Sequence, residues 1–520
     1  MSRGPEEASQ EEAAALLARP GTFAAADAEV TEIETHISRI FIAGDRALKM
    51  KRAVRFPYLD FTTLQGREAA CRAEVELNRR TAPVVYRGVL AVTRQADGTL
   101  ALDGAGEAVE WLVDMNRFDE AGLFDRMAQA GTLRRHPMVD LADHIAVFHG
   151  EAAVTPGAGG ARGTAMIVEN IIECFGEAKS VLAPEKVAAW SEISRAALAR
   201  LTEILDARRD AGAVRHCHGD LHLRNICMID GKPMLFDGIE FNTAFSEIDT
   251  LYDLAFLLMD LDYRGLRRLA DVTFNRYLDV TGEVLERPGT LSVLPLFLSM
   301  RAAIRAHVDA AQVVLLSDPD QQAERRLEAG RYMDMALEYL EPPAPRLVAV
   351  GGLSGGGKSR MARELAPFVG AAPGARVVRT DAVRKRLAGA AQESQLGPEG
   401  YTHEMHERTY AAFVEEARAA LAQGHAVVAD AVFPGPDQRA AIEAVAREMG
   451  VPFHGLWIEA PEDVRVARIT KRRRNISDVT EEIAREQSTY ELGDITWTRI
   501  DSSGPREVTV KKGKASIGIG

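Results

Sequence analysis

The stretch HGDLHLRN, His218–Asn225, decides how the first part of the chain is interpreted. It places two histidines, an aspartate and an asparagine within eight residues, between Cys217 and Cys227. A zinc site would need a second cluster of ligands, which the sequence does not offer at a suitable spacing. A thiol site would need an electropositive setting for Cys217, and nothing further supports one. Phosphoryl transfer explains most of these residues, because it needs a carboxylate to accept the proton of a substrate hydroxyl and an amide oxygen five residues later to hold magnesium.

The phosphoryl-transfer interpretation requires a further aspartate on the short hairpin that follows. Asp237, in MLFDGIEF, lies at this position, and the strands expected at 225–229 and 233–236 flank the turn Asp230-Gly231. Asp220, Asn225 and Asp237 are therefore the candidate residues of a first phosphate site.

A second phosphate site is indicated by GLSGGGKS at Gly352–Ser359, which fits the pattern G-x-x-x-x-G-K-[ST] in every position. The stretch follows an expected strand at 347–350 and opens an expected helix at 360–366, which is the context that the motif requires. Lys358 is expected to reach the β and γ phosphates of a nucleotide, and Ser359 to ligate magnesium. The residues of the expected phosphate cradle are Gly352, Ser354, Gly355, Gly356, Gly357, Lys358 and Ser359.

The residues that follow this motif indicate a kinase-like P-loop domain. Asp381 closes the next strand and forms D-x-x-R with Arg384, while Asp430 ends the strand VVAD as a Walker-B-like carboxylate and a candidate metal ligand. Arg468 and Arg472, in RITKRRRNISD, are four residues apart and share a helical face. The pattern resembles that of small P-loop kinases, and this resemblance implies that the two arginines lie in a lid over the transferring phosphate.

Composition limits the remaining possibilities. The 520 residues suggest two domains, and a net charge of −13 argues against sequence-blind nucleic-acid binding. Four scattered cysteines form no disulfide framework, and the acidic N-terminus does not resemble a secretory signal. The apolar run Leu291–Met300 is too short to span a bilayer and is expected to be broken by Pro295. We therefore expect a reduced, cytoplasmic protein with no membrane segment.

Patterning along the chain predicts two unlike halves. A short helix at 1–20 precedes strand-like segments at 34–54 and 84–94, with a helix at 65–80 between them. Helical patterning dominates 120–341, the linker EPPAP follows, and strands then alternate with helices as in a parallel sheet. We expect a helical extension at 1–20, a first domain at 21–341, a linker at 342–346, a P-loop domain at 347–508 and a tail at 509–520 whose end is disordered.

The first domain resembles the aminoglycoside phosphotransferase branch of the protein-kinase-like fold, through H-G-D-x-x-x-x-N at 218–225 and the later aspartate. The resemblance implies that Asp220 is the catalytic base and that Asn225 and Asp237 hold magnesium. It also implies a nucleotide-anchoring lysine, for which Lys49 is preferred to Lys51. The glutamate partner of this lysine is then Glu74, or less favourably Glu76.

Other features of this resemblance are less specific. The covering loop FIAGDRAL carries one glycine, Gly44, and no G-x-G-x-x-G, and the adenine hinge is expected within Val109–Phe118. Asp249 and Asp253 resemble the structural aspartates below the catalytic loop, with a helix N-cap and a solvated face as the alternatives.

The second domain resembles small P-loop kinases related to gluconate kinase, polynucleotide kinase and zeta-toxin kinases, which are often grouped as AAA-type ATPases. This resemblance implies that Asp381 deprotonates a substrate hydroxyl and that Arg384 holds the substrate. His403-Glu404-Met405-His406 has its histidines three apart, unlike the H-E-x-x-H of zincins, and is expected to be an exposed helix start.

Together the halves resemble a bacterial family of fused phosphotransferase–P-loop proteins over roughly residues 20–505. The predicted fold class is a two-lobed kinase-like domain joined to an α/β P-loop domain. The predicted function is ATP- and Mg²⁺-dependent phosphorylation of small hydroxylated molecules such as sugars, amino sugars or aminoglycoside-like compounds. Alternatives are one active half with a nucleotide-sensing partner, a regulatory module without catalysis, and a polynucleotide-kinase-like C-terminal half. The sequence does not determine the acceptors or the oligomeric state.

Overall fold

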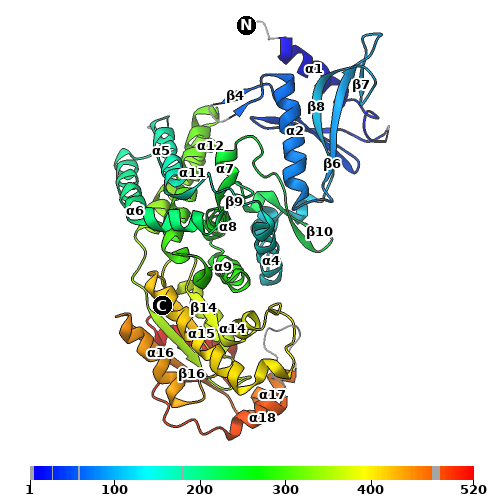
Figure 1. Cartoon of the computed structure of the whole chain (residues 1–520). Helices are drawn as coiled ribbons and strands as arrows, with labels where there is room; N and C mark the ends of the chain where they lie inside the picture. The colour runs from blue at the N-terminus through cyan, green and yellow to red at the C-terminus, as the bar shows by residue number, and fades with distance from the viewer. Residues whose placement is uncertain (1–4, 26, 57–58, 178–179, 471–480, 520) are drawn as a thin grey trace. The chain divides into compact units, whose positions relative to one another are not determined.

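The computed structural model describes residues 5–25, 27–56, 59–177, 180–470 and 481–519 (Figure 1). The chain divides into two compact units. The first comprises residues 1–159 and 214–253, and the second comprises residues 160–213 and 254–520. The predicted linker at 342–346 lies inside the second unit, between a helix and a strand. The division into two units therefore does not test the domain limits predicted from the sequence, and these limits stay a prediction.

The first unit is built around a six-stranded antiparallel sheet of order β1-β2-β3-β8-β6-β7. Its two central neighbours, β3 and β8, place Lys49 opposite Val113. The turn at Gly44, where φ is +58°, joins β2 to β3 as predicted. The strands are β1 Thr31–Glu34, β2 Ser38–Ala43, β3 Arg46–Lys51, β6 Tyr86–Arg94, β7 Leu100–Leu102 and β8 Glu107–Asn116.

Helices cover this sheet. Helix α2, Leu64–Arg79, packs against β8 and β6 and is capped by the Thr63 side chain, which accepts a hydrogen bond from the Gly66 backbone N–H. Helix α1, Pro5–Leu17, contributes Ala13, Ala14 and Leu17 to the apolar core of the sheet. The predicted N-terminal extension is therefore an integral part of this core.

The rest of the first unit carries the HGDLHLRN segment. The hairpin β10–β11 follows it as predicted, and the pair β9–β12 lies beside it. The remaining elements are β4 Arg55–Phe56, β5 Leu59–Asp60, α3 Phe124–Gln129, α4 Arg135–Glu151, β9 Val214–His216, β10 Ile226–Ile229, β11 Lys232–Leu235, α7 Thr243–Ser246 and β12 Glu247–Asp249. Helix α8, Thr250–Tyr263, begins in this unit and continues into the second.

The second unit begins with a group of long helices. They are α5 Gly160–Glu177, α6 Pro184–Asp210, α9 Arg267–Thr281, α10 Glu283–Glu286, α11 Thr290–Leu315 and α12 Pro319–Leu340. Helix α11 continues through Pro295, so the predicted break at this residue is wrong. In the described residues α11 alone is long and apolar enough to cross a membrane. However, 67% of its apolar window is buried inside the protein, as in the core helix of a folded domain.

The P-loop part of this unit is a parallel sheet of order β14-β15-β13-β16-β17, which confirms the predicted α/β class. The strands are β13 Leu347–Gly351, β14 Arg376–Arg379, β15 Val427–Asp430, β16 Phe453–Glu459 and β17 Thr498–Asp501. The helices are α13 Lys358–Leu365, α14 Thr380–Leu387, α15 His403–Ala422, α16 Pro436–Glu448, α17 Glu462–Thr470, α18 Glu481–Glu486 and α19 Arg506–Ser516. Short 3₁₀ turns lie at Glu120–Gly122, Leu223–Asn225, Ala366–Phe368, Pro398–Tyr401 and Gln487–Thr489.

The predicted disordered tail is wrong. Helix α19 places Gly513 so close to Met361 of α13 that a Cβ atom would lie 2.4 Å from the Met361 sulfur. Ile517 is buried in the core of the P-loop sheet together with Ile500. The isoleucines of SIGIG therefore pack into the core. The basic run KKGK before them had suggested an exposed tail.

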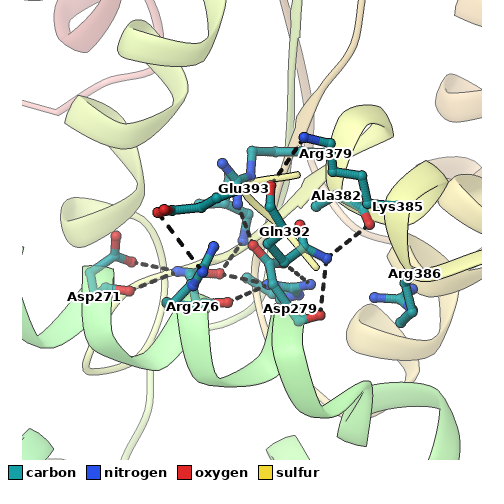
Figure 2. Close-up of polar contacts among 12 residues, drawn as sticks. Asp271, Arg276, Asp279, Arg379, Ala382, Lys385, Arg386, Gln392 and Glu393 are labelled. Atoms are coloured by element: carbon teal, nitrogen blue, oxygen red, sulfur yellow. Dashed lines mark hydrogen bonds and ion pairs between the residues drawn. The ribbon is translucent and has the colours of Figure 1, made fainter. Parts of the chain in front are cut away.

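Helix α9 covers the edge of the P-loop sheet that strand β14 forms. The Asn275 side chain accepts a hydrogen bond from the Val377 N–H at 2.7 Å and donates one to the Ala375 carbonyl at 3.1 Å. It thus replaces the missing neighbour of edge strand β14. In Figure 2, Asp271, Arg276 and Asp279 of α9 all point toward residues of the P-loop part.

Replacing the Asn275 side chain should destabilise the protein. Asn275→Ala leaves a buried N–H and a buried C=O of β14 without partners, each costing about 1–3 kcal/mol. We expect the free energy of unfolding, measured by urea denaturation, to fall by roughly 2–4 kcal/mol. The control Asn170→Ala, on the exposed face of α5, should change it by less than about 0.5 kcal/mol. Equal values for both variants would contradict this role for Asn275.

Candidate active sites

The first candidate site is organised by Lys49 on β3. Its Nζ lies 2.9 Å from Glu74 Oε1 on α2 and 2.6 Å from Asp237 Oδ1. Lys51 also contacts Glu74, at 2.5 Å from Oε2, but its other partner is Glu240. Lys49 is therefore the lysine that joins the α2 glutamate to the predicted metal-binding aspartate, and the structure places it where the preferred interpretation expects the anchoring lysine.

The charges around Lys49 balance one another. Burial alone would raise the pKa of Glu74, but Lys49 and Lys51 outweigh it and hold that pKa below its ordinary value. Burial opposes the charge of Lys49, yet Asp237 and Glu74 raise its pKa well above the usual range. Both groups are thus ionised at neutral pH. Glu76, the weaker candidate, is exposed.

Asp220 and Asn225 face each other across the catalytic loop. The Asn225 Nδ2 donates to Asp220 Oδ2 at 2.8 Å and to the Asp220 carbonyl at 3.0 Å. This orients the carboxylate and turns the amide oxygen of Asn225 away from it. His222 Nε2 lies 3.4 Å from the same Oδ2. Sequence reasoning had considered His222 only as a possible metal ligand.

Asp253 of α8 holds the HGDLHLRN loop in place at His218 and Gly219. Its carboxylate accepts hydrogen bonds from the backbone N–H groups of His218 at 3.0 Å and Gly219 at 2.9 Å. His149 Nε2 lies 3.1 Å from the same carboxylate. Asp253 therefore acts as the structural aspartate that the resemblance implies, whereas Asp249 accepts from the Leu251 N–H and fits the alternative of a helix cap.

Asp237 is fixed by its backbone. Its φ of +61° is uncommon for a residue other than glycine, and its N–H donates to the Tyr86 hydroxyl at 3.1 Å. The next residue, Gly238, donates to Asn78 Oδ1 at 2.8 Å, and Asn78 lies one turn beyond Glu74 on α2. Tyr86 and Asn78 were not identified from the sequence, because buried polar residues of a strand and a helix give no pattern of their own.

The second candidate site is the glycine loop between β13 and α13. Gly352 has a φ of +136°, and a Cβ there would lie 2.3 Å from the Ile458 carbonyl oxygen. Gly355 has a φ of +83°, and a Cβ would lie 2.5 Å from the Arg465 carbonyl oxygen. The loop can thus take this path only with glycine at both positions. The steric limits at Gly352 and Gly355 come from protein atoms alone and do not depend on a bound nucleotide.

Asp430 lies at the carboxyl end of β15 beside the start of α13. Burial raises its pKa, opposed by the charge of Lys358 and by a hydrogen bond from the Ser359 side chain. Its Oδ1 is buried and has no hydrogen-bond partner among the described residues. A carboxylate with an unsatisfied oxygen beside a hydroxyl is a donor set that suits Mg²⁺, so Ser359 and Asp430 fit the predicted metal site.

Asp381 and Arg384, the residues predicted for the acceptor side of this site, both lie on α14. Arg384 is 8% exposed, donates to the Gly400 carbonyl at 3.0 Å and stacks on the Tyr401 ring. Burial lowers the pKa of His406, and the charge of nearby Arg384 lowers this pKa further. The expected exposed helix start is thus correct for His403 and wrong for His406, whose ring packs 4.8 Å from that of Tyr410.

Arg468 lies against the glycine loop. Its guanidinium donates to the Ser502 carbonyl at 2.6 Å and approaches the Gly355 and Gly356 carbonyls at 3.5 Å. These contacts brace the loop, so a phosphate contact for Arg468 remains a prediction. Arg472 lies outside the described residues, as do Arg473 and Arg474.

Comparison with known proteins places these sites in context. The chain is 30% identical over 490 residues to the uncharacterized protein Rv2004c of Mycobacterium tuberculosis, covering 92% of this chain and 93% of the relative. The chain belongs to the Rv2004c family. An uncharacterized protein of Mycobacterium bovis, Mb2027c, matches with the same identity and coverage.

Residues 347–492 of this chain match the AAA domain model. Part of the chain is 32% identical over 120 residues to adenylyl-sulfate kinase of Myxococcus xanthus, covering 23% of this chain and 60% of that enzyme. A solved choline/ethanolamine kinase family protein of Mesorhizobium loti is 14% identical, covers 64% of this chain and 99% of its own, and has a TM-score of 0.38. The matches to the AAA domain model and to adenylyl-sulfate kinase confirm the predicted C-terminal P-loop kinase domain of AAA type and the expectation of a kinase-type enzyme.

Two glycines allow a matched test of the catalytic loop. Both Gly219 and Gly231 have a positive φ, but a Cβ at Gly219 would lie 2.7 Å from the Phe245 carbonyl oxygen, whereas a Cβ at Gly231 meets nothing within 4 Å. We expect Gly219→Ala to displace Asp220 and to lower turnover at the first site at least about 100-fold. Gly231→Ala should cost about 1 kcal/mol of stability and leave turnover nearly unchanged. Steady-state ADP production compares the two; equal turnover would contradict the steric argument.

Proposed function

We propose that this protein is an ATP- and Mg²⁺-dependent phosphotransferase with two separate nucleotide sites, each phosphorylating a hydroxyl group of a small molecule. The observation that carries the proposal is the convergence of Lys49, Glu74 and Asp237 at short distances. The intact glycine loop with Lys358, Ser359 and Asp430 supports the second site.

At the first site Asp220 accepts the proton of the acceptor hydroxyl as its oxygen attacks the γ-phosphorus. A new P–O ester bond forms, the bond to the bridging oxygen breaks, and ADP leaves. Asn225 orients Asp220 through its amide nitrogen, and Lys49 holds the phosphates. Asn225 and Asp237 would hold Mg²⁺, which neutralises the charge on the phosphate oxygens when bound.

At the second site Asp381 has the corresponding task, and Lys358 contacts the β and γ phosphates. Arg384 supports an acceptor that carries a negative group. The Nε of this nearly buried side chain has no hydrogen-bond partner among the described residues. None of the four cysteines forms a disulfide in the described part of the chain, which suits a reducing compartment, and we include cytoplasmic location in the proposal.

Separate substitutions assign each activity to one site. ADP production from Mg-ATP would be measured with a panel of sugars, amino sugars, aminoglycosides, nucleosides and short nucleic-acid ends. Asp220→Ala should lower first-site turnover by about 10²–10⁴-fold. Lys358→Ala should abolish only turnover stimulated by second-site acceptors. Exposed-residue controls are Glu76→Ala and Lys511→Ala, which should behave as the parent.

Each result has a defined meaning. An acceptor whose stimulation is lost in one variant alone is assigned to that half of the chain. Full activity of Asp220→Ala would contradict its role as base. If one half binds ATP without any acceptor-stimulated turnover, the alternative of a nucleotide-sensing half is favoured for it.

A further inference from the structure

We infer that Asp279 of α9, a residue outside the P-loop domain, is a positioning residue of the P-loop centre that keeps Arg379 away from the acidic groups of that centre. The inference rests on the proposed second nucleotide site. It concerns a helix that precedes the P-loop domain in the chain and that belongs to the same compact unit.

Asp279 lies at the centre of a buried network of charges. It is 1% exposed, and its Oδ1 lies 2.7 Å from Arg376 Nη2 while its Oδ2 pairs with Arg379. Arg376 in turn lies 2.6 Å from Glu416 of α15, which also binds Arg386 at 2.5 Å. Three arginines thus share two carboxylates, and only Asp279 among those two contacts Arg379.

The backbone around Asp279 is held independently. Gln392 donates from Nε2 to the Asp279 carbonyl at 3.4 Å and to the Ala382 carbonyl of α14 at 3.1 Å. Figure 2 shows Gln392 between Asp279 and Ala382. Burial would raise the pKa of Asp279, but Arg376 and Arg379 outweigh it and lower that pKa, so the carboxylate is ionised.

Arg379 is close to the metal-binding edge of the P-loop site. It is the last residue of β14, it pairs in register with Asp430 on β15, and it lies two residues before Asp381. The ion-pair partner of Arg379 is Asp279, which the proposed centre does not need, while Asp430 is its neighbour across the sheet and Asp381 follows it closely in the chain.

The consequence of losing Asp279 follows from this geometry. The Arg379 side chain is 13% exposed, and a guanidinium that is largely removed from water is costly without a counter-ion, so Arg379 would turn toward Asp430 or Asp381. It would then occupy the carboxylate that is predicted to bind Mg²⁺ together with Ser359. The P-loop centre therefore depends on a carboxylate supplied by the helical part that precedes the linker.

Binding of Mn²⁺ tests this inference without relying on turnover. Free Mn²⁺ would be followed by EPR in the presence of AMP-PNP, on the full chain with Asp237→Asn to remove the predicted metal site of the first centre. The binding that Lys358→Ala abolishes in this background belongs to the P-loop centre. We expect Asp279→Asn to weaken that binding by about 10- to 100-fold.

A second substitution separates release of Arg379 from general damage. Asp279→Asn combined with Arg379→Gln should recover most of the Mn²⁺ affinity, because no arginine remains to occupy Asp430. The control Asp271→Asn changes a buried carboxyl group on the same helix whose pKa burial raises well above its usual range. It should leave Mn²⁺ affinity unchanged.

The possible failures are distinguishable. If the background chain shows no Mn²⁺ binding that depends on Lys358, the proposed second site is overturned, and the inference with it. If such binding exists and Asp279→Asn leaves it unchanged, the inference alone is overturned. It is also overturned if the double variant binds Mn²⁺ as weakly as Asp279→Asn, since loss of packing would then explain the effect.

Discussion

The short ion pairs that neutralise buried charge are the interaction on which both candidate centres depend. Lys49 and Lys51 can be buried in the first unit because Glu74 faces both of them, and the same pairs fix β3 against α2. Arg376 can be buried in the second unit because Asp279 and Glu416 face it. A buried charge left without its partner is strongly destabilising, so these pairs restrict the positions of the elements that carry the phosphate-binding residues.

The second unit shows that the P-loop sheet is not limited to residues after the linker. Asn275 completes the hydrogen bonding of edge strand β14, and Asp279 binds the arginine at the end of that strand. Both residues belong to α9, which precedes the linker in the chain. A P-loop fragment that begins after residue 346 would lack both contacts. In this chain the P-loop part therefore depends on contacts from a helix that precedes the linker.

Sequence reasoning predicted what is local and failed where the contacts are distant. The motifs at His218–Asn225 and Gly352–Ser359, the turn at Gly44 and the pairing of Lys49 with Glu74 follow from short-range patterns and a family resemblance. Asn78, Tyr86 and Asn275 accept hydrogen bonds from backbone N–H groups far along the chain, which no sequence spacing predicts. The end of the tail was misjudged because a basic run precedes the apolar residues that pack into the core, and α11 was misjudged because the helix continues through Pro295.

The central claim is that one chain carries two nucleotide sites. Equilibrium dialysis of Mg-AMP-PNP against the full chain measures this directly, with Lys49→Ala and Lys358→Ala as single-site variants. The account predicts two nucleotides bound per chain for the natural sequence and one for each variant. A single bound nucleotide for the natural sequence, lost entirely in one variant and retained in the other, would contradict it.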